Sequence, residues 1–191
     1  IICNLVLETL KAIQTRNSVA HLSEPAPSIE EMEEVYKGAL RAPDHAWLRP
    51  WKYIEIRGDA RKKLADSFIK ASISSGEEMT DELREKLEKA PFRAPMVIVL
   101  AADIKEHPKV PKIEQIISLG ASGQNILLAL HDIGYSAVWR TGKMAFNKHI
   151  TEALELPPNY EVIGYLYVGT PSGNIKKLPE LDLTNHLTRW E

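Results

Sequence analysis

The chain has 191 residues, of which 44% are hydrophobic, enough to bury one core in a single domain spanning residues 1–191. Its 24 basic and 26 acidic side chains give a net charge of −2, which argues against nucleic acid as a partner. One cysteine, Cys3, excludes an internal disulfide and favours a cytoplasmic protein, and no apolar run approaches the ~20 residues of a membrane helix.

The first half of the chain predicts helices that alternate with strands. Apolar periodicity predicts a helix over 5–14, and the capping box Ser28-Ile-Glu-Glu31 starts the next helix. The apolar stripe of that second helix comprises Met32, Val35, Tyr36, Ala39 and Leu40. Tyr53–Ile56 predicts a strand, and Asp59 can cap a helix that continues through Ile73.

The second half predicts a central strand and a central helix. Residues 74–89 predict a loop followed by an amphipathic helix, and the continuous apolar run Met96–Ala102 predicts a strand buried on both faces. A long helix is expected over 112–133, where Gly120 and Gly123 permit close approach of another helix or a ligand. The remaining strands are expected at 135–139 and 162–168. The pattern predicts one α+β domain.

The tail, residues 171–191, lacks long periodicity but is too apolar to be freely solvated. Its large apolar residues are Leu178, Leu181, Leu183, Leu187 and Trp190. Such an arm either folds back on its own domain or lies across a partner.

The segment Arg41–Trp51 places two arginines, a histidine and two tryptophans around Pro43 and Pro50. Because proline fixes φ and prevents a helix from continuing, we expect a rigid, irregular loop. Such a loop suits a flat anionic ligand, but it could equally cap the preceding helix while its tryptophans fill a core. The segment alone leaves both interpretations open.

The stretch Thr15–His21 places Arg16 and Ser18 two residues apart, directly after the first predicted helix. Arginine makes charge-assisted, potentially bidentate bonds to a phosphate, and serine adds a neutral donor. A solvated helix end explains the same pair, so the spacing alone does not decide.

Together, these two segments resemble the nitroreductase family of flavin-dependent oxidoreductases, in particular a small subgroup with an Arg-Ala-Pro-Asp-His loop, here Arg41–His45. The other matching pieces follow in order along the chain: Trp51–Ile56, Ala90–Pro95, Gly134–Thr141 and Gly164–Pro171. The resemblance implies an α+β fold with a mixed sheet flanked by helices. It also implies a homodimer that exchanges its C-terminal arms and holds FMN at the interface.

The resemblance assigns roles to two further groups of residues. Arg16, Asn17 and Ser18 match the turn that binds the FMN phosphate and ribityl chain. Arg41 and His45 match positions that reach the flavin from the neighbouring subunit.

The third group implied by the resemblance is Trp139, Arg140 and Thr141, which match the strand-end turn at the isoalloxazine edge. Many relatives carry a lysine two residues past the phosphate serine, where this chain has Ala20. Arg41 or Arg49 could supply the missing cation.

Other chemistries have less support in the sequence. The six histidines form no His-Glu-x-x-His pair, so no metal site is expected, and nucleophile-elbow, phosphate-loop and Gly-x-Gly-x-x-Gly motifs are absent. The resemblance implies an enzyme that passes reducing equivalents from NAD(P)H through FMN to nitroaromatic, quinone-like or similar electron-poor acceptors. The mechanism would be ping-pong, with no catalytic side chain. The alternative is a flavin-binding or regulatory protein with little turnover, which Ala20 favours.

Overall fold

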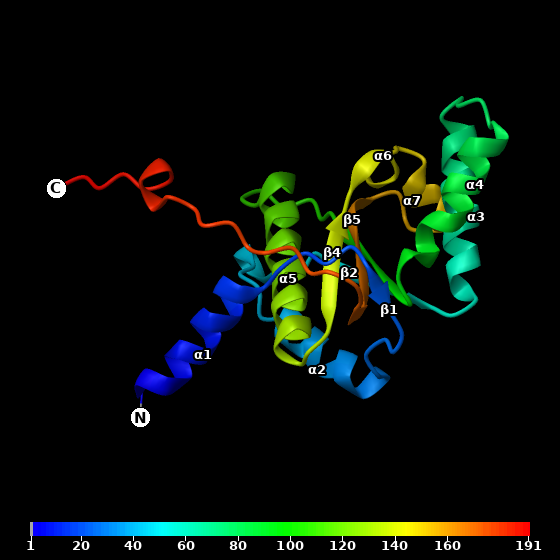
Figure 1. Ribbon diagram of the computed structural model, residues 1–191. Helices are drawn as coiled ribbons and strands as arrows, with labels where there is room; N and C mark the ends of the chain where they lie inside the picture. The colour runs from blue at the N-terminus through cyan, green and yellow to red at the C-terminus, as the bar shows by residue number, and fades with distance from the viewer. Residues whose placement is uncertain (1) are drawn as a thin grey trace.

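One five-stranded sheet organises the fold (Figure 1). The computed structural model describes residues 2–191, and the side chains from Glu8 onward. The strands are β1 (Leu22–Ser23), β2 (Trp51–Arg57), β3 (Met96–Asp103), β4 (Ser136–Arg140) and β5 (Tyr160–Pro171). These named strands pair antiparallel in the order β1-β5-β3-β2, and β4 also pairs with β5. The sheet of named strands is therefore antiparallel and not mixed as predicted; the parallel contact is an isolated bridge between Ser18 and Ala137, outside those strands.

Helices cover both faces of this sheet. They are α1 (Ile2–Thr15), α2 (Ile29–Ala39), α3 (Ala60–Ser74), α4 (Asp81–Lys89), α5 (Lys112–Asp132), α6 (Gly142–Ala145) and α7 (Ile150–Ala153). In Figure 1, α2 and α5 lie on one side of the strands, and α3 and α4 lie on the other. The predicted α+β class, with a sheet flanked by helices, is therefore confirmed.

The central strand β3 shows how the core is divided. Every residue of 96–102 is fully buried, as the continuous apolar run predicts. Successive side chains point to opposite faces of a strand. Met96, Ile98 and Leu100 accordingly join the cluster with α2 and α5, whereas Val97 and Val99 join the cluster with α3.

Helix α2 begins at the predicted capping box. The Ser28 hydroxyl accepts from the Glu31 amide at 3.1 Å, and the Glu31 carboxylate accepts from the Ser28 amide at 2.7 Å. The apolar stripe predicted for this helix is one residue too long: α2 ends at Ala39, and Leu40 is 51% exposed. At α3, Asp59 occupies the cap position but makes no capping bond; its carboxylate pairs with Lys62 at 3.0 Å.

Several short elements are not predicted from the sequence. Helices α6 and α7 have four residues each, about one turn, so they are too short to show periodicity. Strand β1 has two residues. Three 3₁₀ turns complete the described chain: η1 (His45–Trp47), η2 (Ala90–Arg93) and η3 (Leu183–Asn185).

Helix α1 and the C-terminal arm both extend away from the sheet, toward the left of Figure 1. All residues of 173–191 are exposed, and Trp190 is 94% exposed. The arm therefore does not fold back onto its own core. The predicted helix at 5–14 is present, whereas the side chains of Cys3, Leu5 and Leu7 lie outside the described part of the chain. Within that part, no helix is long and apolar enough to cross a membrane.

Candidate functional site

The turn after α1 runs beside the start of β4. Ser18 bridges Ala137 in parallel, and the Val19 amide donates to the Ala137 carbonyl at 3.3 Å. Thr141 follows Ala137 by four residues, so at ~3.3 Å per residue of strand it lies about 13 Å from Ala137. The fold thus brings two of the three predicted groups, 16–18 and 139–141, to one strand.

Arg16 offers a positive charge that the rest of the described chain does not neutralise. Its side chain is half-buried, and its Nη1 is fully buried without a hydrogen-bond partner among the described residues. A buried cationic donor in that state is unfavourable unless an anion meets it. Ser18 is exposed, whereas Asn17 donates from Nδ2 to the Lys176 carbonyl at 2.5 Å and so contacts the arm.

Trp139 is fixed between α5 and β5 by two glycines. A Cβ on Gly123 would lie 2.7 Å from the indole Cζ3, and a Cβ on Gly164 would lie 2.0 Å from its Nε1. The close approach predicted at Gly123 is therefore made by Trp139 of the same chain, while Gly120 faces open space. The indole packs against the core, and its Nε1 is buried without a partner among the described residues.

Arg140 and Arg93 flank the position where the chain carries alanine. A hollow of about 350 Å³ is lined by Ala20, His21, Leu22, Arg93, Arg140 and Ser172. The Arg140 Nε is buried without a partner in the described chain. Arg93 is not among the site residues predicted from the sequence, although it lies within the matching stretch 90–95. Two guanidinium groups, and no carboxylate, line this hollow.

Tyr167 lies close to both guanidinium groups. The Arg140 Cζ is 5.5 Å from the Tyr167 ring centroid. Burial raises the pKa of Tyr167, and the charges of Arg93 and Arg140 oppose that rise only in part. The phenol is therefore neutral near pH 7 and available as a hydrogen-bond donor.

The loop after α2 is irregular, as its prolines predict. Ala46, Trp47 and Arg49 have positive φ, a region that non-glycine residues seldom adopt. The Trp51 indole donates to the Ser118 hydroxyl at 3.0 Å and packs against the core, as expected of a core tryptophan. Trp47 fills no core, since it is 78% exposed.

Arg41 and His45 lie apart from the other predicted residues. Arg41 is exposed and lines a separate hollow of about 210 Å³ together with Arg49. Neither arginine lines the hollow beside Ala20 within one chain. His45 does not cap α2; its Nδ1 lies 2.7 Å from the Glu114 carboxylate, in the first turn of α5.

The length of α5 separates this loop from the turn after α1. The Thr15 hydroxyl lies 3.0 Å from His131 Nε2, in the last turn of α5, whereas His45 contacts Glu114 at the other end. The 17 residues from Glu114 to His131, at ~1.5 Å each, span about 25 Å. One chain therefore does not bring His45 next to Arg16.

The comparisons with known proteins agree with this arrangement of elements. Residues 13–170 match the model of the Nitroreductase family. The chain belongs to the nitroreductase family. The nitroreductase YdjA of Escherichia coli K12, provisionally named an NAD(P)H nitroreductase, is 32% identical over 165 residues, covering 86% of this chain and 89% of that protein. A relative in Haemophilus influenzae, provisionally named in the same way, is 33% identical over the same shares of the two chains.

Solved nitroreductase structures share the fold. A nitroreductase-like protein from Bacillus cereus has a TM-score of 0.81 at 24% identity and covers 96% of each chain. A nitroreductase from Bacteroides fragilis with bound FMN has a TM-score of 0.75 at 16% identity, covering 96% and 99%. NfnB of Mycobacterium smegmatis, described as FMN-dependent and solved with NADPH, has a TM-score of 0.74 at 18% identity, covering 98% and 100%.

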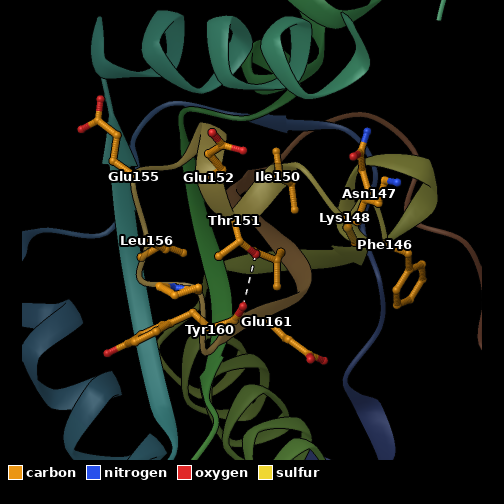
Figure 2. A pocket seen from close by; sticks show the side chains of 13 residues that line it. Phe146, Asn147, Lys148, Ile150, Thr151, Glu152, Glu155, Leu156, Tyr160 and Glu161 are labelled. Carbon is orange, nitrogen blue, oxygen red and sulfur yellow. Dashed lines mark hydrogen bonds between the residues drawn. The ribbon is translucent and has the colours of Figure 1, made fainter. Parts of the chain in front are cut away.

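A further hollow lies away from all of the predicted nitroreductase residues. This space has a volume of about 860 Å³. It lies between the α6–α7 segment and the start of β5 (Figure 2). Thr151 donates to the Tyr160 carbonyl there at 3.2 Å, and Lys148, Glu152 and Glu161 contribute charges of both signs. Its size alone gives no reason to place the chemistry there.

Proposed function

We propose that this nitroreductase is an FMN-dependent NAD(P)H oxidoreductase. It passes reducing equivalents from NAD(P)H to nitroaromatic, quinone-like or similar electron-poor acceptors in a ping-pong sequence. The observation that carries the proposal is the pair of half-buried arginines beside β4, Arg16 and Arg140, each with a buried nitrogen that has no partner in the described chain. The provisional names of the relatives, the FMN of the Bacteroides fragilis structure and the NADPH of NfnB support it.

The residues beside β4 suit FMN chemically. Arg16 and Ser18 would hold the phosphate, because a guanidinium and a hydroxyl both donate to phosphate oxygens. Asn17 would complete that turn while it tethers the arm. Arg140 and Thr141 would hold the ring system, while the indole of Trp139 packs between α5 and β5 and fixes this strand end from the other face of the sheet.

When bound beside Arg16, Arg140 and Thr141, FMN would supply the two-electron redox chemistry between NAD(P)H and the acceptor. The side chains need supply no nucleophile. The guanidinium of Arg140 stabilises negative charge that develops nearby, and the neutral phenol of Tyr167 can donate a hydrogen bond. The buried apolar residues of β4 and β5 exclude water, which strengthens those interactions.

We infer that the working unit is a homodimer of single-domain chains, in which residues 171–191 form exchanged arms. The separation of about 25 Å along α5 supports a site shared between two chains, because Arg41 and His45 could then approach the Arg16 turn of a partner. Exposed apolar side chains also support an interface: Leu40 and Trp47 near Arg41 and His45, Ile113 and Ile117 on α5, and Leu181 and Trp190 in the arm.

One observation favours a second candidate, a flavin-binding or regulatory protein with little turnover. Ala20 cannot provide the cation that many relatives place there. Arg93 and Arg140 line the same hollow as Ala20, however, so positive charge is present without that lysine.

Steady-state kinetics separates the two candidates. The purified protein is expected to hold FMN, identified by chromatography after denaturation. Initial rates of NAD(P)H oxidation at several concentrations of a quinone acceptor should give the parallel double-reciprocal lines of a ping-pong enzyme. FMN binding without acceptor-dependent oxidation would favour the second candidate, and failure to bind FMN would refute both.

A further inference from the structure

Arg93 and Arg140 also line a second hollow, which shares Arg140 and Thr141 with the proposed cofactor contacts and extends from them toward α3 and α4. This hollow has a volume of about 510 Å³ and lies between α3 and α4 on one side and β5 and α6 on the other. It adjoins Thr141 and Gly142, at the end of β4. A space of this size next to a redox site is suitable for a small organic substrate.

The walls of this acceptor hollow are apolar and aromatic. Phe68, Leu87, Tyr165 and Tyr167 line it, and each of these residues is at most 5% exposed. The rings of Phe68 and Tyr165 meet edge to face, with centroids 5.2 Å apart and an interplanar angle of 80°. Such fixed rings favour a flat aromatic guest, which gains by burial and by contact with ring faces and edges.

The charges of the acceptor hollow are unbalanced. Its basic side chains are Lys86, Arg93, Arg140 and Lys143, and its one acidic side chain is Glu77. Glu77 is paired with Lys143, so its charge is already compensated. Lys86, Arg93 and Arg140 form no ion pair within the described part of the chain. The charges of Lys86, Arg93 and Arg140 therefore leave an excess of positive charge beside the apolar walls of the acceptor hollow.

Two details show that this charge is available to a ligand. The Nε of Arg140 is buried without a partner in the described residues, while its Cζ stacks near the Tyr167 ring. Arg93 is exposed and accessible to a group that enters the hollow. A carboxylate can accept two parallel bonds from one guanidinium, which also fixes its direction.

We propose that the acceptor hollow binds aromatic acceptors that carry a carboxylate or a similar anionic group. The ring lies between the apolar walls, and the anion pairs with Arg93, assisted by Arg140. This specificity rests on the proposed function. With 4-nitrobenzoate as the example, one NAD(P)H and one proton reduce the nitro group to nitroso. The products are NAD(P)⁺, 4-nitrosobenzoate and one water.

Calorimetric titration of the FMN-loaded, oxidised protein tests the proposal without turnover. We expect 4-nitrobenzoate to bind at least about tenfold more tightly than uncharged nitrobenzene. Arg93→Gln should weaken 4-nitrobenzoate about tenfold and leave nitrobenzene unchanged, while Arg93→Lys should retain part of the preference. Lys89→Gln is the matched control, because Lys89 is exposed, pairs with Glu85 and does not line the hollow.

Three results would overturn the proposal. They are equal affinity of the wild type for the two probes, an equal loss of both in Arg93→Gln, or the same loss of 4-nitrobenzoate affinity in the control Lys89→Gln. Thermal melting shows that Arg93→Gln is folded, and the flavin absorbance of samples saturated with FMN shows that both proteins are loaded before the titration. A wild-type protein that holds no FMN refutes the proposed function instead, and the titration of that protein still reports on the hollow.

Discussion

Arg16→Ala tests the placement of the cofactor phosphate most simply. Arg16 is half-buried at the end of α1, and its Nη1 has no partner in the described chain. Removing the guanidinium would leave a bound phosphate dianion without its nearest charge-assisted donor. The same change removes nothing that the FMN-free fold uses, apart from the packing of the aliphatic stem.

The expected magnitude follows from this geometry. A hydrogen bond to a charged group contributes about 1.5–3 kcal/mol, so FMN binding should weaken by about 2 kcal/mol or more, or about 30-fold in Kd. Because the Nη1 is buried without compensation, the FMN-free protein should lose at most about 0.5 kcal/mol of stability.

Equilibrium dialysis against FMN measures the first quantity, and urea unfolding of the FMN-free protein measures the second. Lys11→Ala is the matched control, since Lys11 is an exposed cation on the same helix. An unchanged Kd in Arg16→Ala would remove this residue from the site. A large loss of stability without FMN would show that the guanidinium serves the fold instead.

Three further predictions follow from the structure. Gly123→Ala should destabilise the protein by about 1–3 kcal/mol in urea unfolding, because its Cβ would lie 2.7 Å from the Trp139 indole. The control Gly120→Ala, in open space on the same helix, should stabilise the protein or be neutral. Equal effects of the two substitutions would refute the packing of Trp139 against Gly123. Deletion of 174–191 should give folded monomers that lose flavin, and sedimentation equilibrium showing a yellow dimer would exclude arm exchange. Mixing Arg16→Ala protomers with His45→Ala protomers should restore part of the activity, since one of the two sites in a heterodimer then carries neither change. No recovery despite verified subunit exchange would mean that each site draws both residues from a single chain.

The long elements could be predicted because their signals are local. The capping box at Ser28 and the apolar run 96–102 identified α2 and β3 almost to the residue. The one-turn helices α6 and α7 could not be predicted, since four residues show no periodicity and their positions depend on packing against β5 and α3.

The site was predictable only where its residues are close in sequence. Arg16 and Arg140 lie in short motifs, and the bridge at Ser18 brings those motifs to one strand. Arg93 gave no comparable signal, because its position beside Ala20 depends on the antiparallel pairing of β3, β5 and β4. The expected substitute cations, Arg41 and Arg49, follow α2 instead, toward the opposite end of α5.

Anaerobic stopped-flow spectroscopy tests the central claim most directly, because it follows both half-reactions on one sample. We predict that NADH or NADPH bleaches the flavin absorbance of the purified protein and that an electron-poor acceptor, added after the nicotinamide has been removed, restores it. Bleaching no faster than that of free FMN, or a bleached flavin that the acceptor does not reoxidise, would contradict the proposed oxidoreductase function.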